Sequence, residues 1–243
     1  MIKDTTNQFS SWYNTPYYHI LYKDIDNVET HAFMDTLTNY LNLPEQGTIL
    51  DWGCGRGIHA MYLNKIGFDV TGVDQSENNI AYAKKFETQH LRFDVHNMCQ
   101  PYKQQFDAVF NLFSSFGRID RDEDYLNTIK GIKANLNETG FGVIDVANTE
   151  LIIDNLLPEE ITTVGKIDFN LKHYVKHDYI LKDITFVADG ESHHFQECVK
   201  MFTLKDFETL FEQADCYLLD VFGDYKLNKF RSQTSERLVM IFK

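Results

Sequence analysis

The chain of 243 residues has few cysteines and few prolines. None of its four cysteines belongs to a Cys-x-x-Cys pair, and no cluster of histidine and cysteine has the spacing of zinc ligands. We therefore expect free thiols in a reducing compartment and no metal site. The four prolines lie outside the segments with regular hydrophobic periodicity, and the chain has no internal repeat or obvious linker. This length predicts one large domain.

Basic residues are also scarce, because 23 lysines and arginines stand against 36 aspartates and glutamates, which gives a net charge of −13. Such a surface repels phosphate backbones, and no basic patch in the sequence reverses its field. Small molecules or cationic groups are therefore the expected partners, rather than nucleic acid. The chain has no apolar run of about 18 residues that would span a membrane. Its first residues are polar and lack a signal-peptide core, so we expect a cytoplasmic protein.

Short apolar runs alternate with helical periodicity between residues 48 and 147. The expected strands are 48–52, 68–73, 90–95, 106–111 and 141–146, and the expected helices are 57–66, 76–88 and 122–136. This alternation predicts a parallel sheet covered by helices on both faces. Residues 137–140 should end the last of these helices. A further helix is expected over residues 28–42, with its apolar face formed by Val28, Ala32, Phe33, Leu37, Tyr40 and Leu41.

The hydrophobic period changes to two between residues 161 and 202, which predicts three antiparallel strands with a hairpin turn at Asp189-Gly190. Thr203 and Asp206 have the spacing of a capping box, so a helix should follow. Two final strands, 216–222 and 237–242, are expected to pair antiparallel at the edge of the sheet.

The strongest local signal is a glycine-rich turn at Asp51-Trp52-Gly53-Cys54-Gly55-Arg56-Gly57. Glycines permit a tight turn and close approach of a ligand to the backbone, and the free N–H groups of a helix start follow. Ile58 stands where a dinucleotide motif has its third glycine, and no Gly-Lys-Ser/Thr follows as in a P-loop. A carboxylate before the first glycine suits a cationic ligand better than a pyrophosphate.

Asp74 lies nineteen residues after Gly55, at the end of the second expected strand. A carboxylate at this point can accept hydrogen bonds from both hydroxyls of a ribose. The two carboxylates together therefore predict a nucleoside that carries a positive charge and no phosphate. S-adenosylmethionine fits this description.

Asp51-x-Gly53-x-Gly55 followed by Asp74 resembles the first two motifs of class I S-adenosylmethionine-dependent methyltransferases. Val95-His96-Asn97-Met98 resembles the segment that follows their third strand and holds the adenine. The segment 110–117 resembles a loop of sugar-amine N,N-dimethyltransferases that lies beside the transferring methyl group. Residues 17–22 resemble the tyrosine segment that folds over the cofactor in those enzymes. The resemblance covers essentially the whole chain.

The resemblance implies an α/β fold with a Rossmann-like seven-stranded sheet, mostly parallel with an antiparallel last strand, and helices on both faces. In a single methyltransferase domain, residues 1–45 would form a lid over the cofactor, and residues 46–150 and 203–243 would form the core. Residues 151–202 would add a small antiparallel β insertion. This insertion would bind the acceptor or form a dimer, so both a monomer and a homodimer stay open.

The expected methyl donor is S-adenosyl-L-methionine, and the product is S-adenosyl-L-homocysteine. The residues expected to bind it are Tyr18, Tyr22, Asp51, Gly53, Cys54, Gly55, Asp74, Gln75, Asn97, Met98, Asn111 and Phe113. Asp94 is an alternative to Asn97 at the adenine, and His59 should pack beneath the site. Ser114, Ser115, Tyr225 and Arg231 are expected at the acceptor. His19 and His194 are the candidates for a catalytic base.

The expected reaction is in-line transfer of the methyl group to a nitrogen or oxygen atom of a small molecule. Transfer to carbon would need a base, and the sequence shows no committed one. No Asn/Asp-Pro-Pro-Tyr/Phe motif follows the fourth strand, which argues against DNA and glutamine as acceptors. Two alternatives stay open: an RNA or protein methyltransferase, and a protein that binds S-adenosylmethionine without catalysis.

Overall fold

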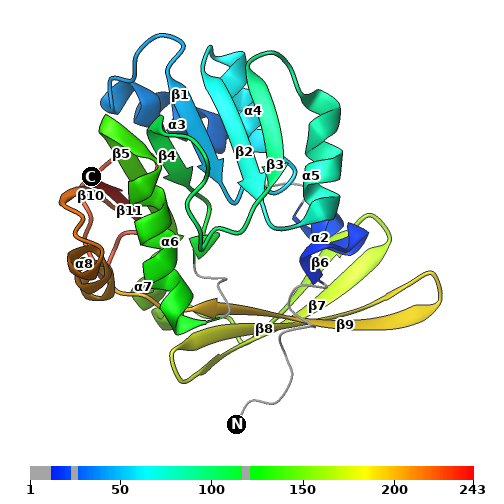
Figure 1. Ribbon diagram of the computed structural model, residues 1–243. Coiled ribbons are helices and arrows are strands. Elements are labelled where there is room, and N and C mark those ends of the chain that lie inside the picture. Colours follow the sequence, from blue (N-terminus) through cyan, green and yellow to red (C-terminus); the bar gives the residue numbers. More distant parts are fainter. Residues whose placement is uncertain (1–11, 23–26, 117–120) are drawn as a thin grey trace. The chain divides into compact units, whose positions relative to one another are not determined.

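The structure, a computed structural model, describes residues 12–22, 27–116 and 121–243 (Figure 1). These residues form two compact units. Unit 1 draws on residues 1–27 and 149–201, and unit 2 on residues 28–148 and 202–243. Within the described ranges, no helix is both long enough and apolar enough to cross a membrane.

Unit 2 is built on a seven-stranded sheet with the order β10-β11-β5-β4-β1-β2-β3. Its strands are β1 (Thr48–Trp52), β2 (Asp69–Asp74), β3 (Leu91–Val95), β4 (Phe106–Asn111), β5 (Leu136–Ala147), β10 (Leu218–Phe222) and β11 (Arg237–Phe242). Strands β1 to β5 pair in parallel, and β11 is antiparallel to both of its neighbours, β5 and β10. The predicted α/β fold, with a mostly parallel sheet and an antiparallel last strand, is confirmed.

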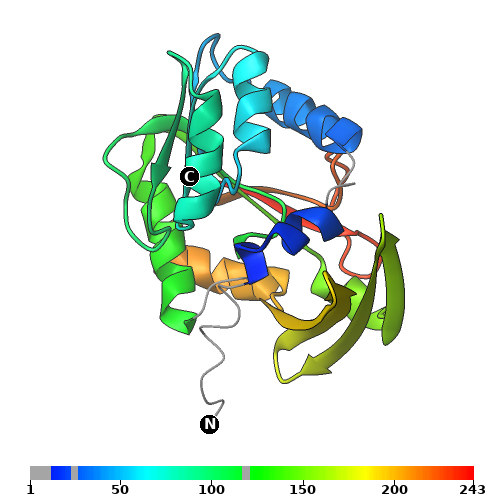
Figure 2. The same ribbon diagram turned by 90° about the vertical axis from the view of Figure 1, so that its right-hand side faces the viewer.

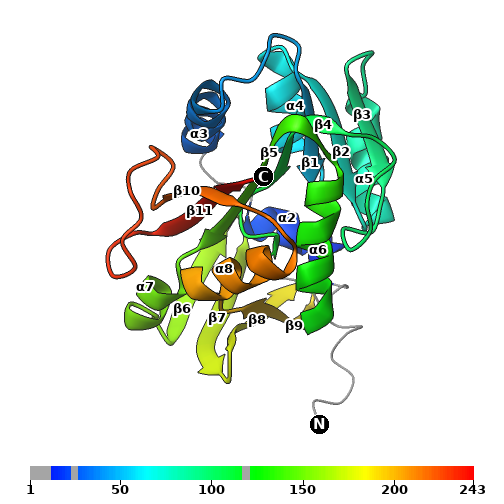
Figure 3. The ribbon, with the colours of Figure 1, turned by 60° about the vertical axis from the view of Figure 1, so that its left-hand side comes forward.

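Helices cover both faces of this sheet, because successive strand residues point to opposite sides. Ile49 packs in a cluster with side chains of α3 (Asn27–Tyr40), α4 (Ile58–Lys65) and α5 (Glu77–Ala83), which Figure 2 shows side by side. A short 3₁₀ turn, η1 (Lys84–Phe86), continues α5. Leu50, the next residue of β1, packs instead with α6 (Asp122–Ala134) and α8 (Leu204–Gln213), seen together in Figure 3. The predicted capping box of Thr203 and Asp206 begins α8.

Two details of the sequence interpretation are wrong. Strand β5 begins at Leu136, where a helix end and a turn over 137–140 were expected, because Leu136 already pairs with Phe106 of β4. Val28, Ala32 and Tyr40 were expected on the buried face of α3, but all three are exposed, Val28 by 78% and Tyr40 by 48%. The buried face of this helix is displaced from the predicted one and is formed by Thr30, Phe33, Met34, Leu37 and Thr38, with Leu41 directly after the helix.

Unit 1 is an antiparallel sheet of four strands, rather than the three expected. They are β6 (Glu159–Val164), β7 (Ile167–Lys176), β8 (Tyr179–Ala188) and β9 (Glu191–Lys200), and the unit also holds α2 (Pro16–Leu21) and α7 (Thr149–Asp154). Strand β6 was not predicted because most of its residues are exposed, so its sequence does not alternate between apolar and polar residues. The turn predicted at Asp189-Gly190 is confirmed, and both residues have positive φ, as a two-residue hairpin turn requires.

The aromatic N-terminal segment packs on this antiparallel sheet. Trp12 is fully buried, and its Nε1 donates a hydrogen bond to Oε1 of Glu197 at 2.7 Å. The hydroxyl of Tyr22 donates to the same buried carboxylate at 2.8 Å, and Lys182 Nζ lies 3.3 Å from it. Thr15 caps the short helix α2 by accepting a hydrogen bond from Tyr18 N, with Pro16 at its first position. These contacts fix residues 12–22 within unit 1.

Candidate active site

The glycine-rich turn connects β1 to α4 at the carboxyl edge of the unit 2 sheet. The N–H groups of Gly53 and Cys54 both donate to Val73 O, at 2.8 and 2.9 Å, and so tie the turn to β2. Gly53, Gly55 and Gly57 have φ of 90°, 55° and 78°. Residues with a Cβ avoid this region, which explains why glycine stands at these positions. Helix α4 begins after Gly57 without a side-chain cap. In its first turn, the backbone of Ala60 hydrogen-bonds to Asp51.

Two carboxylates meet this turn. Asp74 Oδ2 accepts a hydrogen bond from Gly55 N at 3.0 Å, and Oδ1 accepts one from Ser76 N at 2.8 Å. Asp51 Oδ2 is buried and has no hydrogen-bond partner among the residues that the structure describes. Burial, together with the charge of Asp74, raises the pKa of Asp51 to about 7. Burial also raises the pKa of Asp74. This pair of carboxylates would be stabilised by a cation.

Space for a ligand exists at the middle of the turn but not at its ends. A Cβ built on Gly55 would meet nothing within 4 Å, so a ligand can approach its backbone. A Cβ on Gly53 would lie 3.0 Å from Met98 Sδ and 3.2 Å from Ser115 Oγ. Met98 and Ser115 therefore form a wall beside the first glycine.

A second buried polar atom without a partner lies close to this wall. Asn111 is fully buried, and its Nδ2 donates to Trp52 O at 2.6 Å. Its Oδ1 has no partner in the described part of the chain. Asn111 and Met98 are in contact, since Asn111 Nδ2 lies 4.0 Å from Met98 Sδ. The structure therefore brings Asp51, Gly53, Gly55, Asp74, Met98 and Asn111 to one edge of the sheet.

The two alternatives for the adenine have different surroundings. Asn97 Oδ1 accepts a hydrogen bond from Cys99 N at 2.9 Å, so this side-chain carbonyl stabilises the local turn. Asp94 accepts a short hydrogen bond from the Tyr102 hydroxyl and one from Lys103 Nζ at 3.1 Å. The Tyr102 hydrogen bond lowers the pKa of Asp94 against the effect of its partial burial.

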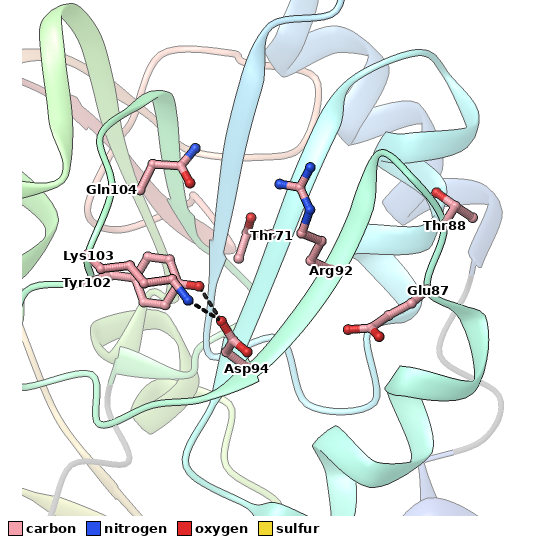
Figure 4. Close-up of a pocket in the computed structure, with 8 residues that line it drawn as sticks. All are labelled: Thr71, Glu87, Thr88, Arg92, Asp94, Tyr102, Lys103 and Gln104. Atoms are coloured by element: carbon pink, nitrogen blue, oxygen red, sulfur yellow. Dashed lines mark hydrogen bonds and ion pairs between the residues drawn. The ribbon is translucent and has the colours of Figure 1, made fainter.

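Asp94 lies instead in a polar depression of about 440 Å³ (Figure 4). The residues that line it are Thr71, Glu87, Thr88, Arg92, Asp94, Tyr102, Lys103 and Gln104. Its charged side chains already have partners: Glu87 accepts from Phe93 N, and Arg92 donates to Gln89 O. We therefore do not place the active site here.

Two further residues expected at the cofactor belong to the same turns. Cys54 is buried, which raises the pKa of its thiol well above the usual value. Its Sγ would lie 3.0 Å from a Cβ at Gly72, so it fills space beside β2. Gln75 follows Asp74 directly, before the cap of α5 at Ser76.

The loop after β4 carries three of the predicted residues, and it is anchored to β5. Phe113 packs face to face with His59, with ring centroids 4.0 Å apart. Burial, and then the charge of His31, lowers the pKa of His59 to about 4, so this ring is neutral. Ser114 Oγ accepts a hydrogen bond from Ala147 N at 3.1 Å. Ser115 forms the wall beside Gly53 described above.

The sequence-based search missed two residues behind this loop, Asp145 and Arg237. Arg237 donates to both carboxylate oxygens of Asp145, at 2.9 and 2.8 Å. The hydroxyl of Tyr225 lies 3.4 Å from the same carboxylate, while Arg231 is exposed. A signal existed for Asp145, because it interrupts the apolar end of β5, whereas Arg237 stands at the first position of β11, where a charged residue attracts no notice.

The remaining candidates lie in unit 1. Tyr18 packs on Tyr22 and on His19, with ring centroids 5.0 and 5.1 Å apart. His194 is exposed, and its Nε2 lies 3.8 Å from Asp183 Oδ1. The roles of Tyr18 and Tyr22 at the cofactor, and of His19 and His194 as catalytic bases, stay predictions from the sequence. No group of three or more His, Cys, Asp or Glu residues that could hold a metal ion occurs among the residues described here.

Comparison with known proteins decides the family. Residues 27–221 match the family model described as a methyltransferase domain. The chain belongs to this methyltransferase family. It is 28% identical to YqeM of Bacillus subtilis strain 168, which is named as a methyltransferase, over 88% of this chain and 91% of that one. It is also 30% identical to a glycine/sarcosine N-methyltransferase of Aphanothece halophytica, over 61% of this chain and 55% of that one.

A solved structure has the same fold as this methyltransferase. It is an S-adenosylmethionine-dependent methyltransferase from Clostridium acetobutylicum, with a TM-score of 0.78 at 21% identity, covering 99% of both chains. S-adenosylmethionine is the methyl donor of the present enzyme. The unpartnered Asp51 oxygen and the open space at Gly55 fit a ligand with a positive charge, and Asp74 fits a ribose.

The raised pKa of Asp51 predicts that cofactor affinity depends on pH. The free methyltransferase holds a proton on Asp51 below about pH 7, and a cationic cofactor requires the ionised carboxylate, so binding releases this proton. We expect the dissociation constant to rise about tenfold as the pH falls from about 8 to about 6. Calorimetric titrations across this range measure it. Asp51→Asn is the control, and an equally steep pH dependence in that variant would contradict the assignment.

Proposed function

We propose that this methyltransferase transfers the methyl group to a nitrogen or oxygen atom of a small molecule, and that an amine is the preferred acceptor. The observation that carries the proposal is electrostatic. A net charge of −13 gives the chain a negative electrostatic field. This field attracts amines, which are cationic in water, and repels the phosphates of RNA and DNA.

The loop after β4 supports the same proposal. Asn111 is followed by Leu112, Phe113 and Ser114, where enzymes that methylate exocyclic amines of bases have two prolines and an aromatic residue. Its amide is fully buried and donates to Trp52 O, so it is turned into the sheet. The relative from Aphanothece halophytica is named for N-methylation of glycine and sarcosine, which are small amines.

The chemistry needs little help from the protein. Bound S-adenosylmethionine supplies a methyl group whose bond to sulfur breaks with its electron pair left on sulfur, while the lone pair of the acceptor forms the new bond. An ammonium acceptor first loses a proton to water. The residues of the site would orient the acceptor in line with this bond and exclude water, which contributes about 7–11 kcal/mol in well-aligned reactions.

No strong base is required for this reaction. Histidine is the commonest general base, but the low pKa of His59 makes it a weak one. Nitrogen or oxygen acceptors are therefore favoured over carbon. His19 and His194 keep their proposed role as bases that would assist removal of the proton.

We also propose that unit 1 governs the choice of acceptor. Its antiparallel sheet carries an aromatic cluster with Trp12, Phe169 and Phe186, and a buried carboxylate at Glu197. In this proposal Tyr18 and Tyr22 cover the cofactor. Dimer formation through the same sheet is the other role proposed for this unit.

The test is transfer of a tritiated methyl group from S-adenosylmethionine to a defined panel. Glycine, sarcosine, an amino sugar and a catechol represent small acceptors, and bulk tRNA and histones represent macromolecules. We expect product from at least one small amine and none from tRNA or histones, and less product from Asp74→Ala at a subsaturating concentration of S-adenosylmethionine. Methylation of tRNA or histones without methylation of any small molecule would contradict the proposal.

A further inference from the structure

The loop after β4 has a backbone conformation that is unfavourable for the residues it contains. Phe113 and Ser114 are consecutive and have φ of 58° and 66°, in the left-handed region. Residues with a Cβ rarely adopt this conformation, and a turn with two such residues normally carries glycine or asparagine. Other parts of the molecule must therefore hold the loop in this shape.

One buried ion pair makes these contacts. Asp145 is fully buried on β5, and its Oδ2 accepts a hydrogen bond from Phe113 N at 2.9 Å. The backbone oxygen of Asp145 accepts from Ser114 N at 3.0 Å. Arg237 of β11 binds both carboxylate oxygens and also donates to Ser114 Oγ at 3.1 Å. The pair thus contacts each of the two strained residues.

The other end of the loop faces the glycine-rich turn. Ser115 follows the strained residues directly, and its Oγ would lie 3.2 Å from a Cβ at Gly53. Phe113 packs on His59, which lies in the first turn of α4 after the glycines. A shift of Phe113 and Ser114 would therefore move two walls of the cofactor site.

We propose that Arg237 and Asp145 are positioning residues of the methyltransferase, which hold the Phe113–Ser115 loop against the glycine-rich turn. Arginine suits this role because its planar guanidinium binds the carboxylate with two parallel hydrogen bonds and keeps a third donor for Ser114. Lysine offers a single charged point and cannot hold both partners in the same plane. The proposal rests on cofactor binding and is independent of the acceptor class proposed above.

The primary test compares Arg237→Gln and Arg237→Lys with the wild type. Hydrogen exchange of the Phe113 and Ser114 amides, measured by NMR, should be at least tenfold faster in Arg237→Gln and intermediate in Arg237→Lys. Calorimetry with S-adenosylhomocysteine should show an affinity about tenfold weaker in Arg237→Gln, again with Arg237→Lys in between. Both measurements need no acceptor.

Leu91→Ala is the matched control, because it removes a buried side chain at the amino end of β3, the sheet edge opposite the glycine turn. It should lower the melting temperature. The exchange rates of the Phe113 and Ser114 amides and the affinity for S-adenosylhomocysteine should stay within twofold of the wild type. Ser114→Ala removes the hydroxyl that Arg237 contacts. If Arg237→Gln does not fold, amide exchange and affinity are compared between Ser114→Ala and Leu91→Ala instead. Exchange and affinity in these variants no different from Leu91→Ala would overturn the proposal.

Discussion

Replacing Asp74 by alanine is expected to weaken binding of S-adenosylmethionine about 100-fold. The carboxylate would accept hydrogen bonds from two ribose hydroxyls, and each bond to a charged group contributes about 1.5–3 kcal/mol. The change also removes the acceptor of Gly55 N and Ser76 N, so the glycine-rich turn loses two of its own contacts. Calorimetric titration of the variant measures the loss.

Asp69→Ala is the matched control for this variant. Asp69 begins the same strand, β2, at the opposite edge of the sheet, where it lies near His90 and Arg92. We expect its cofactor affinity to stay within twofold of the wild type. An affinity of Asp74→Ala within threefold of the wild type would show that the ribose binds elsewhere.

Gly57→Ala is expected to lower the free energy of unfolding by about 2–5 kcal/mol. A Cβ at this position would lie 2.4 and 2.5 Å from two ring carbons of Phe93, at a φ of +78°. The left-handed backbone costs an alanine about 1–2 kcal/mol, and overpacking adds about 1–3 kcal/mol. Urea denaturation measures the change.

Gly190→Ala separates the two causes of this destabilisation. Gly190 has a φ of +82°, close to that of Gly57, and a Cβ there would meet no atom within 4 Å, so this variant reports the backbone strain alone. The double variant Gly57→Ala/Phe93→Leu should relieve part of the clash that Gly57→Ala creates. Equal losses of stability in Gly57→Ala and Gly190→Ala would mean that Phe93 does not restrict this turn.

The sequence predicted the parallel core well because each signal there is local. A strand, the glycine turn and the start of α4 follow one another within residues 48–65, and the short apolar run that forms β1 is visible in the chain itself. The same holds for the hairpin at Asp189-Gly190, which needs only two residues with positive φ. Such features need no knowledge of distant contacts.

Features that depend on distant partners were missed. Arg237 and Asp145 are separated by 92 residues, and only the pairing of β11 with β5 brings them together. The buried face of α3 was misplaced because it includes Thr30 and Thr38, which hydrophobicity alone does not single out. The unpartnered oxygens of Asp51 and Asn111 likewise appear only in three dimensions.

Calorimetric titration of the purified protein with S-adenosylmethionine, and then with S-adenosylhomocysteine, tests the cofactor site most directly. The account predicts one site per chain, with a micromolar dissociation constant for both ligands, and weaker binding in Asp51→Ala and Asp74→Ala. Absence of binding to either ligand, or unchanged affinity in both variants, would contradict it.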